Sequence, residues 1–335
     1  MLFLKKFFQP RQEPLIGLDI GAASLCWVEL APAGRGGLRL ERCAVEALEP
    51  GWMVEGHIER FDDVAAALQR LAASSGSRHR RVALAMPTAQ LQIRQHVFPL
   101  GLSQAELALQ VSVEVARHSG RLVQEVALDY GVLPQSHGGA LPDPDAGLTV
   151  WIATAPIDKL QDRLGLAESA GLLPVIMDGE AQARARAACR LVQLRHAKDA
   201  GGMAGDAVVV LVHVEAGLAV WQWMDGDTVL HQGQTAASGL DDADALARGV
   251  LADLWRFAGT PAHGRPDLIL LAGVDAMAPG LAEAMQSAAA CECVLADPLA
   301  AMQLGDAAMR TDLTPQTRAS LMTACGLALR RFASC

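Results

Sequence analysis

Two stretches of the chain, residues 15–30 and 207–223, share one plan, in which a short loop with Gly or Ala joins two apolar runs. The first stretch is LIGLDIGAASLCWVEL. Apolar runs on either side of a small-residue loop predict a β-hairpin. A hairpin that recurs far along the chain favours a molecule with two similar halves, whose loops face each other across a cleft. The alternative is two unrelated hairpins, because any two hairpins look alike in sequence.

The composition fits a large, ordered protein. The chain has 335 residues, enough for two domains or one two-lobed domain. Hydrophobic residues make up 51% of it and charged residues 19%, which is typical of a globular chain. The net charge of −9 argues against general nucleic-acid binding, because that binding rests on Lys and Arg side chains that neutralise phosphates.

No apolar run approaches the roughly 20 residues of a membrane-spanning helix. The start, MLFLKKFFQPRQEP, has apolar pieces that are too short for a signal peptide. We expect an N-terminal arm there, either frayed or touching a membrane surface or a partner. Seven scattered cysteines without an export signal predict reduced thiols. Cys291 and Cys293 lack a second pair at metal-ligand spacing, so we expect no metal site.

The patterns along the chain predict mixed strands and helices, which indicates an α/β fold. Ser103 and Glu106 predict a capping box at the start of a helix. Residues 134–147 predict an exposed loop, and the Gly-rich residues 198–206 a boundary. Strands are expected at 15–21, 25–30, 38–48, 80–87, 91–100, 125–133, 148–155 and 173–178, three times within 207–235, and at 267–273. Helices are expected at 62–74, 103–118, 157–171, 179–197, about 240–258, from Pro279, and from Thr314 and Pro315 to the C-terminus.

The loop of the first hairpin is a candidate anion site. Its residues, Gly21, Ala22, Ala23 and Ser24, are small, so their backbone N–H groups can approach and turn toward a phosphate. Asp19, on the preceding strand, could hold a hydrated Mg²⁺ beside it. The alternative is a plain hairpin in which Asp19 caps its own turn.

The same stretch resembles the first phosphate loop of the actin-like ATPase superfamily. More narrowly, it resembles the opening of the type IV pilus assembly protein PilM family, which is related to the cell-division protein FtsA. Further PilM-like segments follow in order, and their register indicates a divergent member of that family. These segments are RRVALAMP, VFPLGLSQAELALQVSVEVAR with EVALDYGVL, IDKLQDRLGLAESAGLLPVIMDGEAQARA, LILLAGVDAMAPGLAEAM and ADPLAAM.

The resemblance implies a two-lobed actin-like (ribonuclease H-like) α/β fold with an inserted subdomain of the FtsA and PilM type. The implied segments are an arm (1–14), a first lobe (15–87 and 157–200), the insert (88–156), a second lobe (207–311) and a C-terminal helix that packs on the first lobe (312–335). That last helix could instead be amphipathic and lie on a surface. ATP would lie between the lobes, and Glu180 resembles the acidic residue that orients water. The implied nucleotide-binding positions are Asp19, Gly21, Ala22, Ala23, Ser24, His213, Glu215, Gly217, Gly273 and Val274, with Mg²⁺ held through water by Asp19.

Four departures from the family pattern argue against ATP hydrolysis. Cys26 stands where the family usually has Lys, so the positive charge is missing. The second loop reads HVEA instead of roughly Asp-Ile-Gly-Ala, so His213 replaces a carboxylate and Glu215 a glycine. Gly273 is followed by Val274 rather than by a second glycine. We expect a degenerate cleft, with binding of ATP and Mg²⁺ left open. His213 is interpreted as a buried histidine in a decayed site, with a catalytic base as the alternative.

The resemblance implies a cytoplasmic scaffold of type IV pilus assembly and twitching motility, peripheral to the inner membrane. Its partner would be the N-terminal tail of a PilN-like inner-membrane protein, held in a groove that involves the insert, and it would connect to pilus motor ATPases. Whether it forms homo-oligomers stays open. Alternatives are an active ATPase whose nucleotide state regulates assembly, a sugar kinase, and the cytoplasmic GspL-like component of type II secretion. GspL-like chains normally continue into a transmembrane helix, and the ending GLALRRFASC shows none.

Overall fold

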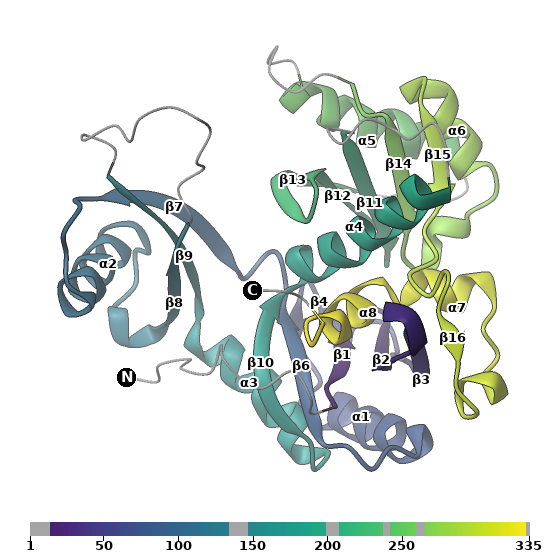
Figure 1. Ribbon diagram of the computed structural model, residues 1–335, viewed down its shortest axis with the longest axis horizontal. Coiled ribbons are helices and arrows are strands. Elements are labelled where there is room, and N and C mark those ends of the chain that lie inside the picture. Colours follow the sequence, from purple (N-terminus) through teal and green to yellow (C-terminus); the bar gives the residue numbers. More distant parts are fainter. Residues whose placement is uncertain (1–13, 134–146, 199–207, 237–241, 259–264, 333–335) are drawn as a thin grey trace. The chain divides into compact units, whose positions relative to one another are not determined.

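The computed structural model describes residues 14–133, 147–198, 208–236, 242–258 and 265–332 (Figure 1). The N-terminal arm, the loop at 134–146 and the boundary at 199–206 lie outside the described residues. The described residues form two units: a small unit over 86–165 and a large unit that holds the rest. The five-part division expected from the sequence stays a prediction.

The large unit contains a six-stranded sheet built around the first hairpin. Strands β1 (Ile16–Ile20), β2 (Ser24–Pro32) and β3 (Leu38–Ala47) follow one another antiparallel, and β6 (Arg81–Met86) runs parallel to β1. Helix α1 (Phe61–Ser75) contacts β2 and β3, and a short hairpin of β4 (Met53–Val54) and β5 (His57–Ile58) precedes it. The strand order is β10 (Leu173–Gly179), β6 (Arg81–Met86), β1 (Ile16–Ile20), β2 (Ser24–Pro32), β3 (Leu38–Ala47) and β16 (Gln303–Leu304).

A second sheet, of five strands, forms around the second hairpin. Its central strands β11 (Val209–Glu215) and β14 (Leu268–Ala272) are buried on both faces, as their unbroken apolar runs predict. One face packs against α5 (Ala243–Ala258) and α6 (Leu281–Ala289), with Trp221 and Trp223 in the core between them. The strand order is β13 (Thr228–Ala236), β12 (Leu218–Asp225), β11 (Val209–Glu215), β14 (Leu268–Ala272) and β15 (Glu292–Leu295).

Two helices, α4 (Glu180–Lys198) and α8 (Met322–Leu329), share one hydrophobic core with both sheets. Their contact is close because glycines lie where a side chain would not fit. A Cβ at Gly17 on β1 would overlap the backbone of Ala324, and a Cβ at Gly326 would overlap the backbone of Ala183. Arg186 on α4 donates from one terminal guanidinium nitrogen to the Gly326 carbonyl at 2.8 Å, and its other terminal nitrogen donates to the Asp178 carboxylate. The two sheets are therefore joined through an α4–α8 pair that tolerates little change in volume.

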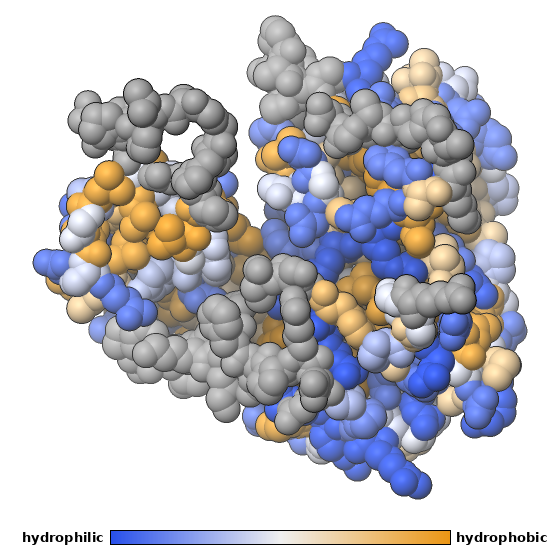
Figure 2. Space-filling view, viewed as in Figure 1, coloured by the Kyte–Doolittle hydropathy of each residue, from blue (hydrophilic) through white to orange (hydrophobic). Residues whose placement is uncertain are grey.

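The small unit is a three-stranded antiparallel sheet with one helix on it. Its strand order is β7 (Gln92–Phe98), β9 (Leu148–Pro156) and β8 (Val126–Val132). Helix α2 (Gln104–His118) packs its apolar face on Phe98, Val150 and Ile152. The Ser103–Glu106 capping box is confirmed, with both hydrogen bonds present. On the outer side of α2, Leu109 is 66% exposed, and Figure 2 shows hydrophobic residues gathered over this unit. Helix α3 (Ile157–Ser169) follows β9 directly.

The structure corrects two helix boundaries. The last helix, expected to run unbroken from Pro315, is two helices, α7 (Pro315–Ser320) and α8, because the chain leaves helical geometry at Leu321. The sixth helix begins at Leu281 after Gly280, not at Pro279. The sequence patterns also missed short elements, which are β4, β5, β15, β16 and the 3-10 turns η1 (Gly34–Gly36), η2 (Val123–Glu125), η3 (Val274–Met277) and η4 (Ala308–Arg310).

Replacing Gly326 by Ala should destabilise the protein although Ala favours helix. The new methyl group would meet the Ala183 backbone, so α4 and α8 must move apart. We expect the free energy of unfolding to fall by about 1–3 kcal/mol, measured by urea denaturation. The control is Gly34→Ala, where an added Cβ has no neighbour within 4 Å. Equal stability of the two variants would contradict the close approach.

Candidate functional site

The loop between β1 and β2 is a tight turn of small residues. Gly21 N–H donates to the Ser24 carbonyl at 3.0 Å, which closes the loop. Ala22 is exposed, whereas Asp19, on β1, is only 7% exposed. The N–H of Ala23 points out of the turn and donates to a carboxylate oxygen of Glu215 at 3.1 Å.

The loop between β11 and β12 has two residues, Ala216 and Gly217. Glu215 pairs with Leu218 across the hairpin, and the φ angles of Ala216 and Gly217 are 51° and 76°. Positive φ at both positions defines the twisted two-residue turn that best matches hairpin strands. Gly217 is therefore explained by the positive φ angle that this turn requires. Ala216 N–H donates to Asp275 Oδ2 at 3.0 Å.

Glu215 connects the two hairpins. Its Oε1 accepts the Ala23 N–H, and its Oε2 lies 3.2 Å from His213 Nε2. His213 is 5% exposed, and its other ring nitrogen, Nδ1, has no hydrogen-bond partner among the described residues. Both side chains come from β11, two residues apart, so they lie on the same face of that strand.

The surroundings keep Glu215 ionised. Burial alone would raise its pKa, but the hydrogen bond and charge of His213, the Ala23 N–H and the charge of Arg184 outweigh burial, so the pKa lies below its ordinary value. The pKa of Asp275 is raised by burial and by the negative charge of Glu215, although the Ala216 N–H acts in the opposite direction.

Glu180, the first residue of α4, lies one helical turn before Arg184, and the two side chains pair at 3.3 Å. The Arg184 side chain is 5% exposed. A carboxylate held this way is oriented by an arginine of its own helix. Sequence reasoning named Glu180 but missed Arg184, although an arginine four residues after a glutamate in an Ala-rich helix is a visible signal.

The loop after β14 holds Gly273 and Val274. Gly273 has φ 96°, a Cβ there would overlap the backbone of Val214, and its N–H donates to the Ala319 carbonyl at 3.0 Å. Val274 begins η3 (Val274–Met277). Gly273 is therefore required by the close packing of this loop on β11. Asp275, in the same loop, was missed from the sequence.

Cys26, at the position where the family pattern has Lys, is a core residue. It is 1% exposed, and its Sγ lies 3.5 Å from the carbonyl of Ser320, at the break between α7 and α8. Ser24 Oγ also lies 3.5 Å from this sulfur. Burial and the charge of Asp19 raise the pKa of Cys26 strongly, so the thiol is neutral.

These residues do not fit ATP and Mg²⁺ as the loops are folded. A nucleotide phosphate would need the Ala23 N–H that Glu215 occupies, and it would meet a carboxylate there. In the Glu215 cluster, His213 Nδ1 is a buried side-chain atom without a partner among the described residues, and it is a nitrogen, whereas Mg²⁺ takes oxygen ligands. Nowhere in the described residues do three or more His, Cys, Asp or Glu side chains form a group that could hold a metal ion.

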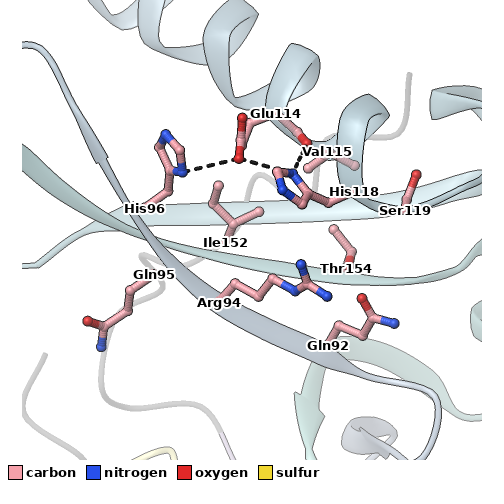
Figure 3. Close-up of a pocket in the computed structure, with 10 residues that line it drawn as sticks. All are labelled: Gln92, Arg94, Gln95, His96, Glu114, Val115, His118, Ser119, Ile152 and Thr154. Carbon is pink, nitrogen blue, oxygen red and sulfur yellow. Dashed lines mark hydrogen bonds and ion pairs between the residues drawn. The ribbon is translucent and has the colours of Figure 1, made fainter.

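The small unit carries a pocket of about 160 Å³ between β7 and the C-terminal half of α2 (Figure 3). A carboxylate oxygen of Glu114, on α2, lies 3.2 Å from His96 Nδ1 and 3.0 Å from His118 Nδ1. Arg94 extends along β7 into the pocket (Figure 3). The sequence patterns missed this pocket. Its lining residues are Gln92, Arg94, Gln95, His96, Glu114, Val115, His118, Ser119, Ile152 and Thr154.

The two sheets share the helices α4 and α8, and the first hairpin loop contacts the second hairpin through Ala23 and Glu215. This arrangement defines the class of protein: the chain has an actin-like ATPase fold. The family model of the type IV pilus assembly protein PilM matches residues 17–236 and 243–332. The chain belongs to this family and is a type IV pilus assembly component.

Solved structures show the same fold. A chain of the PilM–PilN type IV pilus biogenesis complex is 20% identical, with TM-score 0.74 over 97% of this chain and 100% of that one. The ethanolamine utilization protein EutJ from Carboxydothermus hydrogenoformans is 13% identical, with TM-score 0.50 over 97% of this chain and 92% of that one. None of the helices in the described ranges has the length and apolar character that crossing a membrane requires.

The buried thiols should resist alkylation in the folded chain. Burial raises the pKa of Cys325 to about 12 and that of Cys26 still further, and only the thiolate reacts quickly. At about pH 8, iodoacetamide should modify the partly exposed Cys189 and Cys291 first, as measured by peptide mass spectrometry. In denaturant all four should react. Rapid modification of Cys26 in the folded chain would contradict its place in the core.

Proposed function

We propose that this chain is an adaptor of the type IV pilus machinery that binds the N-terminal tail of a PilN-like inner-membrane protein in extended form. The observation that carries the proposal is the match to the PilM family over nearly the whole chain. The PilM–PilN biogenesis complex, with TM-score 0.74 over 97% of this chain, supports the choice of partner.

The small unit offers a surface suited to an extended peptide. β7 pairs with β9 on one side only, so its other edge carries unpaired backbone groups within the described sheet. An extended peptide can add to such an edge through main-chain hydrogen bonds. Residues 92–95 of β7 are exposed, and the pocket opens beside them.

The lining of the pocket suits polar or acidic groups of the peptide. Arg94 has a guanidinium that projects into the pocket without a partner in the described structure (Figure 3). Gln92 and Thr154 supply neutral donors and acceptors near it. A charge-assisted hydrogen bond from Arg94 to a peptide carboxylate or carbonyl would fix the register of the tail.

Peptide capture needs no catalysis, so the adaptor would work with a degenerate ATP cleft. The Glu215 contact with Ala23 supports that part of the proposal. The family further supports a place at the cytoplasmic side of the inner membrane, held there by partners, a link to pilus motor ATPases, and a role in twitching motility. These points rest on the family alone.

A synthetic peptide with the tail sequence of the PilN-like protein from the same genome should bind the purified chain. We expect Arg94→Glu to weaken binding at least tenfold, about the effect of losing one charge-assisted hydrogen bond, measured by calorimetry. ATP with Mg²⁺ should leave the affinity unchanged.

The matched control is Arg121→Glu, an exposed arginine of the same unit that does not line the pocket. It makes the same charge change and should bind like the natural chain. No binding by the natural chain, with or without ATP, would refute the adaptor. If the Arg94→Glu variant binds the peptide as tightly as the natural chain, the peptide does not bind in this pocket.

A further inference from the structure

The chain supplies its own anion to the loop that resembles a phosphate site. Glu215 accepts the Ala23 N–H at 3.1 Å, although 192 positions separate the two residues. A Cβ at Gly21 would lie 3.3 and 3.6 Å from the two carboxylate oxygens of Glu215. The whole carboxylate therefore lies against the backbone of the β1–β2 loop.

The β11–β12 loop is held in a similar way. The N–H of Ala216, in the turn, donates to Asp275 Oδ2 at 3.0 Å. An N–H in a tight turn of small residues favours an anion, because nothing shields its partial positive charge. Each of these two loops thus holds a carboxylate from another element of this chain, and Glu215 is the one that joins the two hairpins.

The charge of Glu215 is compensated inside the chain. His213 Nε2 lies 3.2 Å from Oε2, and Arg184 adds a positive charge from α4. The titratable or charged groups that act on Glu215 or respond to it come from four elements: His213 on β11, Arg184 on α4, Cys26 on β2 and Asp275 on η3.

We infer that Glu215 takes the place of a bound phosphate and holds the β1–β2 and β11–β12 hairpins together without a nucleotide. The residue that blocks the loop is therefore also the residue that stabilises it. The inference goes beyond peptide binding and does not depend on it, because it concerns a different unit of the molecule.

Removing the carboxylate should loosen the large unit and free the loop. We expect Glu215→Ala to lower the melting temperature by about 4 °C or more. Inorganic pyrophosphate should then raise the melting temperature of this variant by about 2 °C or more, because the freed N–H groups bind it. The natural chain should show no such rise. The control is Glu49→Ala, an exposed glutamate between β3 and β4, which should resemble the natural chain in both respects.

Three results would overturn the inference. One is an unchanged melting temperature for Glu215→Ala. Another is an equal response of the natural chain and the variant to pyrophosphate. The third needs no alanine variant: an Ala23 amide that exchanges with solvent in the natural chain as fast as a free amide. Glu215→Gln, which keeps the shape and loses the charge, should speed that exchange about tenfold.

Acid should weaken the link. The pKa of Glu215 is lowered in the folded chain, so its contribution is present above the unfolded value near pH 4.3 and is lost as the pH falls through the lower folded pKa. The difference in melting temperature between the natural chain and Glu215→Gln should therefore shrink as the pH falls below about 4.3. A constant difference down to the lowest pH at which both fold would overturn the ionic part of the inference.

Discussion

The close contact of α8 with β1 and α4 is the constraint on which the large unit depends. Gly17 and Gly326 leave room for backbone to touch backbone, and this contact sets the separation of the two sheets. The hairpin loops extend from those sheets, so their distance follows from it. The hydrogen bond of 3.1 Å between Ala23 and Glu215 joins the two loops at that distance.

The charged residues between the sheets differ from a catalytic arrangement in one respect: they already have partners. Arg184 pairs with Glu180, and His213 with Glu215. Phosphoryl transfer requires positive charge directed at the transferred group, and here the positive charge is directed at carboxylates of the chain. Such a cluster orders and stabilises its surroundings.

Most of the regular elements could be predicted from the sequence, because they depend on local patterns. The capping box at Ser103 and both hairpins are examples. The break at Leu321 could not be predicted, since the apolar pattern continues through it. The first loop of the candidate site was found from its small residues and the role of the second through resemblance, but the partners of these loops were not found. The pairing of Ala23 with Glu215 joins positions far apart in sequence, and no local pattern encodes it. The pocket beside β7 combines a strand and a helix in the same way.

The two-residue turn at Ala216 and Gly217 limits the substitutions that the second hairpin can accept. A carboxylate introduced at position 213 would place a second negative charge beside Glu215 on the same face of β11, where like charges repel. Loss of Glu215 first would leave His213 buried without its partner. A longer turn would break the pairing of Glu215 with Leu218. Each of these single changes therefore costs stability, including the loss of Glu215, which also frees the β1–β2 loop for an anion.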